Sequence, residues 1–348
     1  MWLLSTDRAE LRFFVGPEDT DLQWDGGYAI LSHVWDKEET SFQDLQTLIR
    51  RCGKTGENPR DHVPEKIRKS CILAERYRLK WIWIDTCCID KTSSAELSEA
   101  INAMFRYYAM SAVCYAFLRD VPANYKAECS SAFDRSEGHP SGWSHWRLQF
   151  HQSRWHRRGW TLQELVAPKL VLFVSSDWRI LGTKFELAGL LEEITGIQAC
   201  ILRLEKDVAD ISIAGRMRWA RSRETTRPED EAYSLMGIFG ISIPILYGEG
   251  RKAFYRLQEE IMRTSADASL FLWGESVCTL DSLRKHPSWQ MVRSDGRSHC
   301  DIHLKTHSHL MAHSPQDFRI EFSPESDHNR CSETVSTTHV LGAFVLRC

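Results

Sequence analysis

Three short stretches of this sequence concentrate side chains that can do chemistry. The first carries a serine, an imidazole and an indole, the second carboxylates and thiols, and the third guanidinium groups and a glutamate. The candidates are Ser32, His33 and Trp35, then Asp85, Cys87 and Asp90, then Arg157, Arg158, Trp160 and Glu164. Brought into one crevice, such groups could bind an anionic substrate and stabilise a developing charge.

Glu164 is the candidate that is hardest to explain as a purely structural residue. It lies four residues after Trp160 in the segment Trp155–Val166, which we expect to be helical, so the two side chains share one face. A carboxylate beside a large aromatic ring is desolvated unless it faces a cleft. Position alone leaves a functional and a structural role equally open.

The other candidates have structural readings that the sequence leaves open. Trp35 and Trp160 can be core or wall residues, and Asp85 can cap a turn. Cys87 can be a small buried apolar residue, because free cysteine is commonly buried. The arginines can form surface salt bridges.

Four apolar runs predict the strands that must position these residues. They are Tyr28–Val34, Trp81–Asp85, Ala112–Leu118 and Leu170–Val174. Runs that are nearly all apolar are typical of strands buried on both faces of a parallel sheet. Helical patterns lie between them, so we predict an α/β fold with a parallel, three-layer sheet and active groups at the carboxyl ends of its strands.

Two of the intervening helices have clear signals at their beginnings. Pro64 is expected to open a helix in which Ile67, Cys71 and Ala74 share one face. The pair Ser93 and Glu96 forms a capping-box pattern before a second helix. The apolar residues of that second helix recur at helical spacing, namely Leu97, Ile101, Met104, Phe105 and Tyr108.

Beyond about residue 195 the strand signal fades. We divide the chain into a first domain of residues 1–195, a helical extension of residues 196–278 and a tail of residues 279–348. In the extension, Thr226 and Glu229 match a capping box, and a later helix is marked by Phe254, Leu257 and Ile261. The tail holds eight of the fourteen histidines with little periodicity, which indicates a poorly ordered end or a truncated β-rich part.

Composition and charge exclude several classes of function. The formal net charge of −3 provides no overall basic field, so we expect no nucleic acid partner. The N-terminus lacks a signal-peptide pattern and no run of about 18 apolar residues occurs, so we expect neither secretion nor a membrane span. Eleven cysteines, two of them adjacent, indicate reduced thiols and a cytoplasmic location.

Several familiar motifs are absent or incomplete. Gly53-Lys54-Thr55 resembles the end of a phosphate-binding loop, but Leu48 stands where the first glycine belongs. Neither a dinucleotide-binding glycine pattern nor a hydrolase nucleophile elbow occurs. Cys300, His303 and His307 have ligand-like spacing but lack a second cysteine pair, so we expect no metal site.

The three stretches, read as SHVW, WIDTCCIDK and RGWTLQE, resemble in order and interval the HET domain of fungal heterokaryon-incompatibility proteins. The resemblance covers about Tyr28 to Pro168. Residues 1–15, 219–239 and 246–261 also resemble the extension found in many such proteins. Asp36, in place of a frequent glycine, and Lys91, in place of a frequent glutamine, depart from the pattern in the neighbouring loops.

This resemblance implies a role in non-self recognition, in which contact between genetically different hyphae triggers cell death. HET domains are also similar to TIR domains, whose flavodoxin-like sheet supports NAD⁺ glycohydrolase activity through a glutamate on the helix after the third strand. In this sequence that helix carries Glu164. The resemblance therefore implies NAD⁺ or a related nucleotide as substrate with no resident cofactor, and self-association or a protein trigger as partnerships.

We hypothesise that anionic Glu164 stabilises the positive charge that develops on the ribose when nicotinamide leaves. Arg157 and Arg158 are then candidate pyrophosphate ligands, and Trp35 or Trp160 a candidate wall for nicotinamide. The remaining acidic candidates, Asp85 and Asp90, are expected to order the loop after the second strand.

Two alternatives belong to other functional classes. One is a non-enzymatic signalling module that acts by self-association. The other is thiol chemistry, in which His33 activates Cys87 or Cys88.

Overall fold

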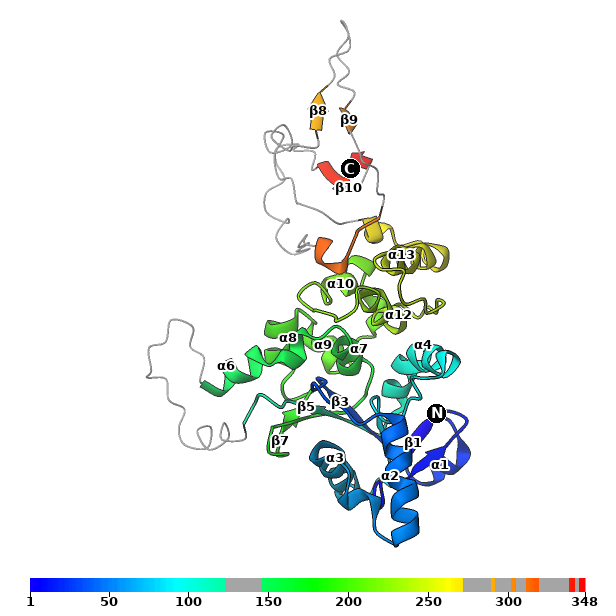
Figure 1. Cartoon of the computed structure of the whole chain (residues 1–348). Helices are drawn as coiled ribbons and strands as arrows, with labels where there is room; N and C mark the ends of the chain where they lie inside the picture. Colours follow the sequence, from blue (N-terminus) through cyan, green and yellow to red (C-terminus); the bar gives the residue numbers. More distant parts are fainter. Residues whose placement is uncertain are drawn as a thin grey trace, which may run out of the picture.

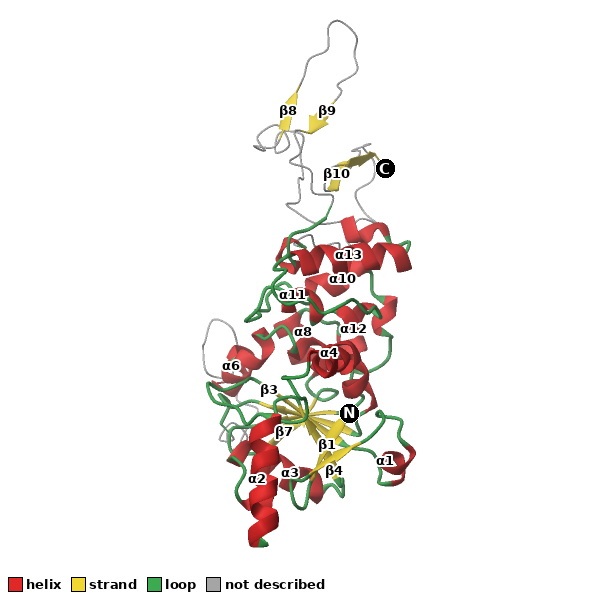
Figure 2. Cartoon of the chain, turned by 45° about the vertical axis from the view of Figure 1, so that its right-hand side comes forward, coloured by secondary structure: helices red, strands yellow, loops and turns green. Residues whose placement is uncertain are grey.

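Seven strands form one mixed sheet, which lies in the lower part of Figure 2 between helices. This computed structural model describes residues 1–122, 145–271, 289–291, 302–304, 311–318, 338–341 and 344–347. The strands are β1 (Trp2–Ser5), β2 (Leu11–Phe13), β3 (Ala29–His33), β4 (Trp81–Ile84), β5 (Val113–Phe117), β6 (Val171–Val174) and β7 (Ile180–Thr183). Their order across the sheet is β2-β1-β4-β3-β5-β6-β7.

The four central strands are parallel, as the apolar runs predict. Strand β3 pairs with β4 on one side and with β5 on the other, and β5 pairs with β6. All residues of these four strands are buried, because helices cover both faces of the sheet. The chain therefore winds outward in both directions from β3, and the strand order reverses between β3 and β5.

The prediction of a wholly parallel sheet is wrong at its edges. Strands β1 and β2 form a hairpin whose β1 adds antiparallel to β4, and β7 adds antiparallel to β6. These strands have three or four residues, and β2 is largely exposed, so they lack the long apolar run that marks a central strand. The fold is therefore α/β with a parallel centre and antiparallel edges.

Helices lie on both faces of the sheet. Figure 2 shows α2 (Phe42–Thr55) and α3 (Glu65–Arg76) below the strands and α4 (Ser94–Met110) above them. The expected signals are present: α3 follows Pro64 and buries its apolar face, and the Ser93 hydroxyl accepts a hydrogen bond from the Glu96 amide at the start of α4. On α4 the side chains of Ile101, Met104 and Tyr108 are buried.

The expected single helix over residues 155–166 is wrong. The chain forms a 3₁₀ turn, η2 (Arg154–Arg157), then an extended residue, Arg158, and only then the short helix α7 (Thr161–Val166). The interruption has a long-range cause, since Arg158 makes an isolated parallel bridge with Glu224. Trp160 thus precedes the first turn of α7, and Glu164 lies within that helix.

The extension lies on the side of α4 and α7 that faces away from the sheet (Figure 1). Its helices are α9 (Ala199–Leu202), η3 (Val208–Asp210), α10 (Ile213–Arg218), α11 (Asp230–Tyr233), α12 (Met236–Phe239), α13 (Lys252–Thr264) and η4 (Ala268–Phe271). The first domain also contains α1 (Thr20–Trp24), η1 (Pro59–Asp61), α6 (His145–Gln152) and α8 (Ala188–Thr195). Side chains of the extension and of the first domain share one hydrophobic core.

Glycine at position 237 allows the extension to pack closely on α4. A Cβ atom there would lie 2.1 Å from the Phe105 Cβ, a separation that real Cβ atoms do not reach. The predicted amphipathic face of α13 is confirmed, since Phe254, Leu257 and Ile261 are buried. These contacts hold the extension against the side of the sheet that carries Glu164.

The predicted capping box at Thr226 is wrong. Helix α11 begins after Glu229, and no side chain caps it. The Glu229 carboxylate instead accepts hydrogen bonds from the amides of Gly248 and Gly250, at 2.8 and 2.9 Å. It therefore ties α11 to the loop that contains Tyr247.

Most of the histidine-rich tail, including Cys300 and His307, lies outside the described residues. The described parts of the tail are β8 (Trp289–Met291), β9 (Ile302–Leu304), η5 (Pro315–Asp317), β10 (Thr338–Leu341) and β11 (Phe344–Arg347). Across the described chain, no helix combines the length and the apolar character needed to cross a bilayer.

Candidate functional site

A pocket of about 450 Å³ lies between the first domain and the extension. Its lining consists of Trp35, Asp85, Ile89, Lys91, Leu97, Ile101, Met104, Arg158, Trp160, Glu164, Glu224, Thr225, Thr226, Arg227, Asp230 and Tyr247. The volume and the combination of apolar and charged lining residues are compatible with a small-molecule site. Five of the predicted candidates line it, namely Trp35, Asp85, Arg158, Trp160 and Glu164.

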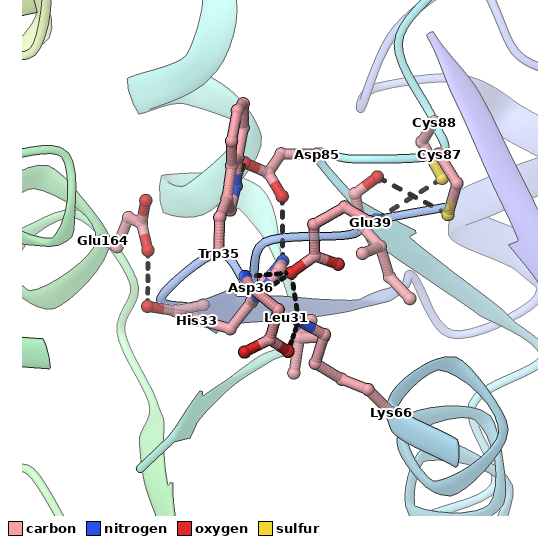
Figure 3. Close-up of polar contacts among 12 residues, drawn as sticks. Leu31, His33, Trp35, Asp36, Glu39, Lys66, Asp85, Cys87, Cys88 and Glu164 are labelled. Carbon is pink, nitrogen blue, oxygen red and sulfur yellow. Dashed lines mark hydrogen bonds and ion pairs between the residues drawn. The ribbon is translucent and has the colours of Figure 1, made fainter. Parts of the chain in front are cut away.

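Glu164 lies at the base of this pocket and is 5% exposed. The Ser32 hydroxyl donates a hydrogen bond of 2.5 Å to Glu164 Oε2, which is the dashed line that ends on Glu164 in Figure 3. The Trp155 indole donates a hydrogen bond of 2.8 Å to the same hydroxyl. Burial raises the pKa of Glu164 to about 7, and the charge of Asp85 adds to the rise. The Ser32 hydrogen bond and the charge of Arg158 offset only part of it. Near neutral pH this carboxyl therefore exchanges readily between its neutral and ionised forms.

Asp85 follows the end of β4 and remains ionised. His33 Nε2 lies 3.0 Å from Asp85 Oδ1, and the Trp35 indole donates a hydrogen bond of 2.7 Å to Oδ2 (Figure 3). Burial alone would raise the pKa of Asp85, but the hydrogen bond and charge of His33, with the charges of Lys91 and Arg158, lower it well below its usual range. This carboxylate fixes the orientation of the Trp35 ring.

Two cations pack on the Trp35 ring. Lys91 Nζ lies 4.1 Å and Arg158 Cζ 5.0 Å from a ring centroid of this side chain. Neither cation forms an ion pair with any carboxylate among the described residues. The buried Arg158 Nε also lacks a hydrogen-bond partner in the described chain. Cations held in place by a ring, with donors to spare, can bind an anionic ligand.

The extension supplies further lining residues with an arrangement of the same kind. Arg227 Cζ lies 4.3 Å from the centroid of the Tyr247 ring. The Tyr247 hydroxyl donates a hydrogen bond of 3.0 Å to Asp230 Oδ1. Burial raises the pKa of Asp230, and hydrogen bonds from Trp160 and Tyr247 only partly offset this rise.

Ser32 and His33 were predicted to contact the substrate, but the structure places both behind the pocket. Their exposed fractions are 0% and 3%, and neither lines the cavity. Each touches a carboxylate that does line it, since Ser32 binds Glu164 and His33 binds Asp85. Their contribution is therefore to position these two carboxyl groups and to favour their ionised forms.

The prediction that Cys87 contacts the substrate is corrected by its position. After β4 the chain turns so that Cys87 and Cys88 point into the core, and the pocket is lined instead by Ile89. The Cys88 sulfur accepts a hydrogen bond from the Ile84 amide, and burial raises the pKa of this thiol well above its ordinary value. Since His33 is engaged with Asp85, the structure offers no support for the thiol hypothesis.

Asp90 and Arg157 also lie outside the pocket. Asp90 accepts hydrogen bonds from the Thr92 amide at 2.9 Å and from Gln43 Nε2 at 2.6 Å, so it orders the loop before α4. The Arg157 side chain is exposed, and only its carbonyl takes part locally, as acceptor for the Glu224 amide. Neither residue is among those that line this pocket.

Sequence reasoning missed Lys91 and the whole contribution of the extension. The rule used, that ligands bind at the carboxyl ends of parallel strands, does not extend to a segment more than sixty residues further along the chain. The available signal was the run RETTRPED, in which Arg227 lies among acidic residues just before a helix. Its significance depends on a contact that the sequence does not reveal.

The pocket lining contains no histidine or cysteine. Any side-chain or backbone ligand that it could offer to a metal is therefore an oxygen atom of a carboxylate, a hydroxyl or a carbonyl. Elsewhere in the described residues, ligand atoms of Cys52, Glu57 and His62 lie within 4.8 Å of one another. An ion pair of 3.3 Å between His62 and Glu57, and a hydrogen bond of 3.0 Å from Thr55 to Glu57, account for this cluster.

Comparison with known proteins identifies two family matches. Residues 28–164 match the family described as heterokaryon incompatibility protein (HET), and residues 252–341 match a domain of unknown function (DUF8212). The chain is 44% identical over 237 residues, or 67% of its length, to vegetative incompatibility protein HET-E-1 of Podospora anserina. That match spans only 16% of the relative. No solved structure matches the chain.

Proposed function

Residues 28–164 form a domain of the heterokaryon incompatibility (HET) family, and from this premise we propose that the chain acts in fungal non-self recognition by cleaving NAD⁺. Release of nicotinamide and loss of NAD⁺ would then cause cell death. The observation that carries this proposal is the carboxyl of Glu164 at the base of a pocket whose walls hold unpaired cations.

The reaction breaks the bond between the ribose C1′ and the nicotinamide nitrogen. Nicotinamide leaves as a neutral molecule and takes the bonding electron pair, so little general-acid help is needed. The ribose becomes oxocarbenium-like, water adds at C1′, and a proton is released to give ADP-ribose. Ionised Glu164, itself buried, faces the developing positive charge and stabilises it.

The two tryptophans of the pocket differ in what they can hold. Lys91 and Arg158 cover Trp35, and these cations would repel the positively charged nicotinamide ring. The same two cations suit the pyrophosphate of the substrate. Trp160 carries no such cation in the described chain and lies four residues before Glu164, so we place the nicotinamide against Trp160.

Two residues behind the pocket complete the arrangement. Ser32, itself held by Trp155, donates to Glu164 and favours its ionised form. His33 and Trp35 hold Asp85 as an anion on the neighbouring strand end. The result is one carboxylate that titrates near pH 7 beside another that stays charged.

The proposal is tested by following nicotinamide release from NAD⁺ by the purified full chain. Glu164→Gln keeps the size of the side chain and removes its charge, and we expect it to lower turnover by at least about 100-fold. Glu192→Gln changes an exposed glutamate of α8 and should leave turnover unchanged. Equal turnover in the wild type and Glu164→Gln would remove Glu164 from the mechanism.

The biological role is tested by expressing the same proteins in fungal cells. We expect the wild type and Glu192→Gln to kill the cells, with a fall in NAD⁺, and Glu164→Gln to be tolerated at equal abundance. Killing by Glu164→Gln without loss of NAD⁺ would contradict enzymatic action and favour a self-associating signalling module.

A further inference from the structure

Residues of the first domain and residues of the extension both line the pocket. The residues from the extension have no role in the proposed cleavage of NAD⁺. We define the extension wall as Glu224, Thr225, Thr226, Arg227, Asp230 and Tyr247, which are the lining residues that follow residue 195. None of them is placed at the ribose carbon by the proposed reaction. Their chemistry therefore calls for a separate explanation.

The extension wall is joined firmly to the helix that carries Glu164. The Glu224 amide donates to the Arg157 carbonyl at 2.6 Å, and the Gly159 amide donates to the Glu224 carbonyl at 2.8 Å. Buried Arg223 donates to the Arg158 carbonyl and to the Thr161 hydroxyl, at 2.9 and 2.8 Å. Because Thr161 begins α7, the wall keeps a fixed position relative to that helix.

Gly159 is what permits this close approach. A Cβ atom at this position would lie 2.5 Å from Thr225 Cγ2 and 3.5 Å from the Glu224 carbonyl oxygen. Any larger side chain would push the extension wall away from the first domain. The pocket is thus closed on this side by a contact that only glycine allows without rearrangement.

Arg227 is the one cation of the extension wall, and its surroundings leave its donors available. The guanidinium packs on Tyr247 and forms no ion pair within the described chain, and its side chain is exposed. Three of the four carboxylates that line the pocket are already engaged: Asp230 by Tyr247, Asp85 by His33 and Trp35, and Glu164 by Ser32.

Two guanidinium groups, Arg158 from the first domain and Arg227 from the extension, therefore line one pocket with unpaired donors and aromatic support. A planar guanidinium binds a phosphate through two parallel N–H groups. Two such groups in one cavity match a ligand with two linked phosphates better than a single carboxylate or phosphate.

We infer that the extension wall is a diphosphate subsite, in which Arg227 acts with Arg158 to bind the pyrophosphate of a nucleoside diphosphate. This inference rests on the proposed function in assigning that nucleoside diphosphate to the same substrate whose ribose faces Glu164. It makes Arg227 a determinant of ligand affinity that lies outside the HET match at residues 28–164. The extension is then a structural part of the binding site.

The test uses ADP as the probe, because ADP carries the diphosphate but has no bond to nicotinamide. Binding to the purified full chain is measured by titration calorimetry at low salt. We expect Arg227→Gln to weaken ADP binding by at least about tenfold. The matched control is Arg221→Gln, an exposed arginine of the extension that does not line the pocket, and it should bind ADP as the wild type does.

Absence of ADP binding by the wild type, or equal affinity in Arg227→Gln, would overturn the inference. If Arg227→Gln fails to fold, the salt dependence of ADP binding to the wild type decides: a steep fall with ionic strength supports contact with the cations, and a flat dependence refutes it. ADP binding without NAD⁺ cleavage would refute the proposed function but not the diphosphate subsite. NAD⁺ cleavage without ADP binding would refute the subsite but not the proposed function.

Discussion

Replacing Glu164 by glutamine should stabilise the protein, and the gain should grow with pH. Burial raises the pKa of this carboxyl from 4.5 to about 7 in the folded protein. The folded state therefore binds its proton more tightly than the unfolded state does. The stability that results is fully present below pH 4.5 and is lost as the pH rises through 7. Between pH 5 and pH 8 the linkage relation gives a loss of about 2 to 3 kcal/mol, and the glutamine variant does not have this loss.

The assay is urea denaturation of the wild type, Glu164→Gln and Glu192→Gln at several pH values from 5 to 8. The other titrating groups are common to all three proteins, so their contributions cancel in the differences. We expect the free energy of unfolding of Glu164→Gln to rise relative to the wild type by about 2 to 3 kcal/mol over this range. Glu192→Gln should keep a constant difference because its glutamate is exposed. A constant difference for Glu164→Gln as well would refute the desolvation of this carboxyl.

Three further predictions follow from the same geometry. NAD⁺ cleavage should rise with pH to a plateau with a midpoint near 7, because the ionised form of Glu164 is required, and a profile that is flat or falls would contradict this. Ser32→Ala removes a hydrogen bond to that form and should move the midpoint upward by about one pH unit, so an unchanged midpoint would exclude the positioning role. Gly159→Ala brings a Cβ against Thr225, so it should lower the free energy of unfolding by about 1 to 3 kcal/mol and weaken ADP binding. Gly189→Ala, where the added Cβ meets open space, should have neither effect. A melting temperature and an ADP affinity of Gly159→Ala equal to those of the wild type would contradict this prediction.

Much of the sheet could be predicted from the sequence because its signals are local. The central strands β3, β4, β5 and β6 are buried on both faces, so they appear as runs that are nearly all apolar. Helix α4 could be predicted from its capping serine and its apolar spacing. The edge strands could not, because short strands with an exposed face carry no such run.

The site could be predicted only in part, for a physical reason. Glu164, Asp85 and Trp35 lie close to strand ends or on the helix between strands, where a parallel sheet gathers ligand-binding groups. The wall that contains Arg227 depends on the bridge between Arg158 and residue 224, which joins segments far apart in the chain. The same bridge interrupts the helix expected over residues 155–166, so one long-range contact explains both errors.

The sequence also did not predict in which direction the side chains of the loop after β4 point. Cys87 and Asp90 follow β4 as closely as Asp85 does, yet the turn after Ile84 sends the thiol into the core. Asp90 bonds the backbone of its own loop. A motif can therefore indicate where a site lies without indicating which of its members face the ligand.

The central claim is that Glu164, at the base of the composite pocket, drives cleavage of the bond between ribose and nicotinamide. Mass spectrometry of NAD⁺ incubated with the full chain at pH 8 tests it most directly. The account predicts equal amounts of nicotinamide and ADP-ribose from the wild type and almost none from Glu164→Gln. Intact NAD⁺ with the wild type, or the same products at the same rate from the variant, would contradict it.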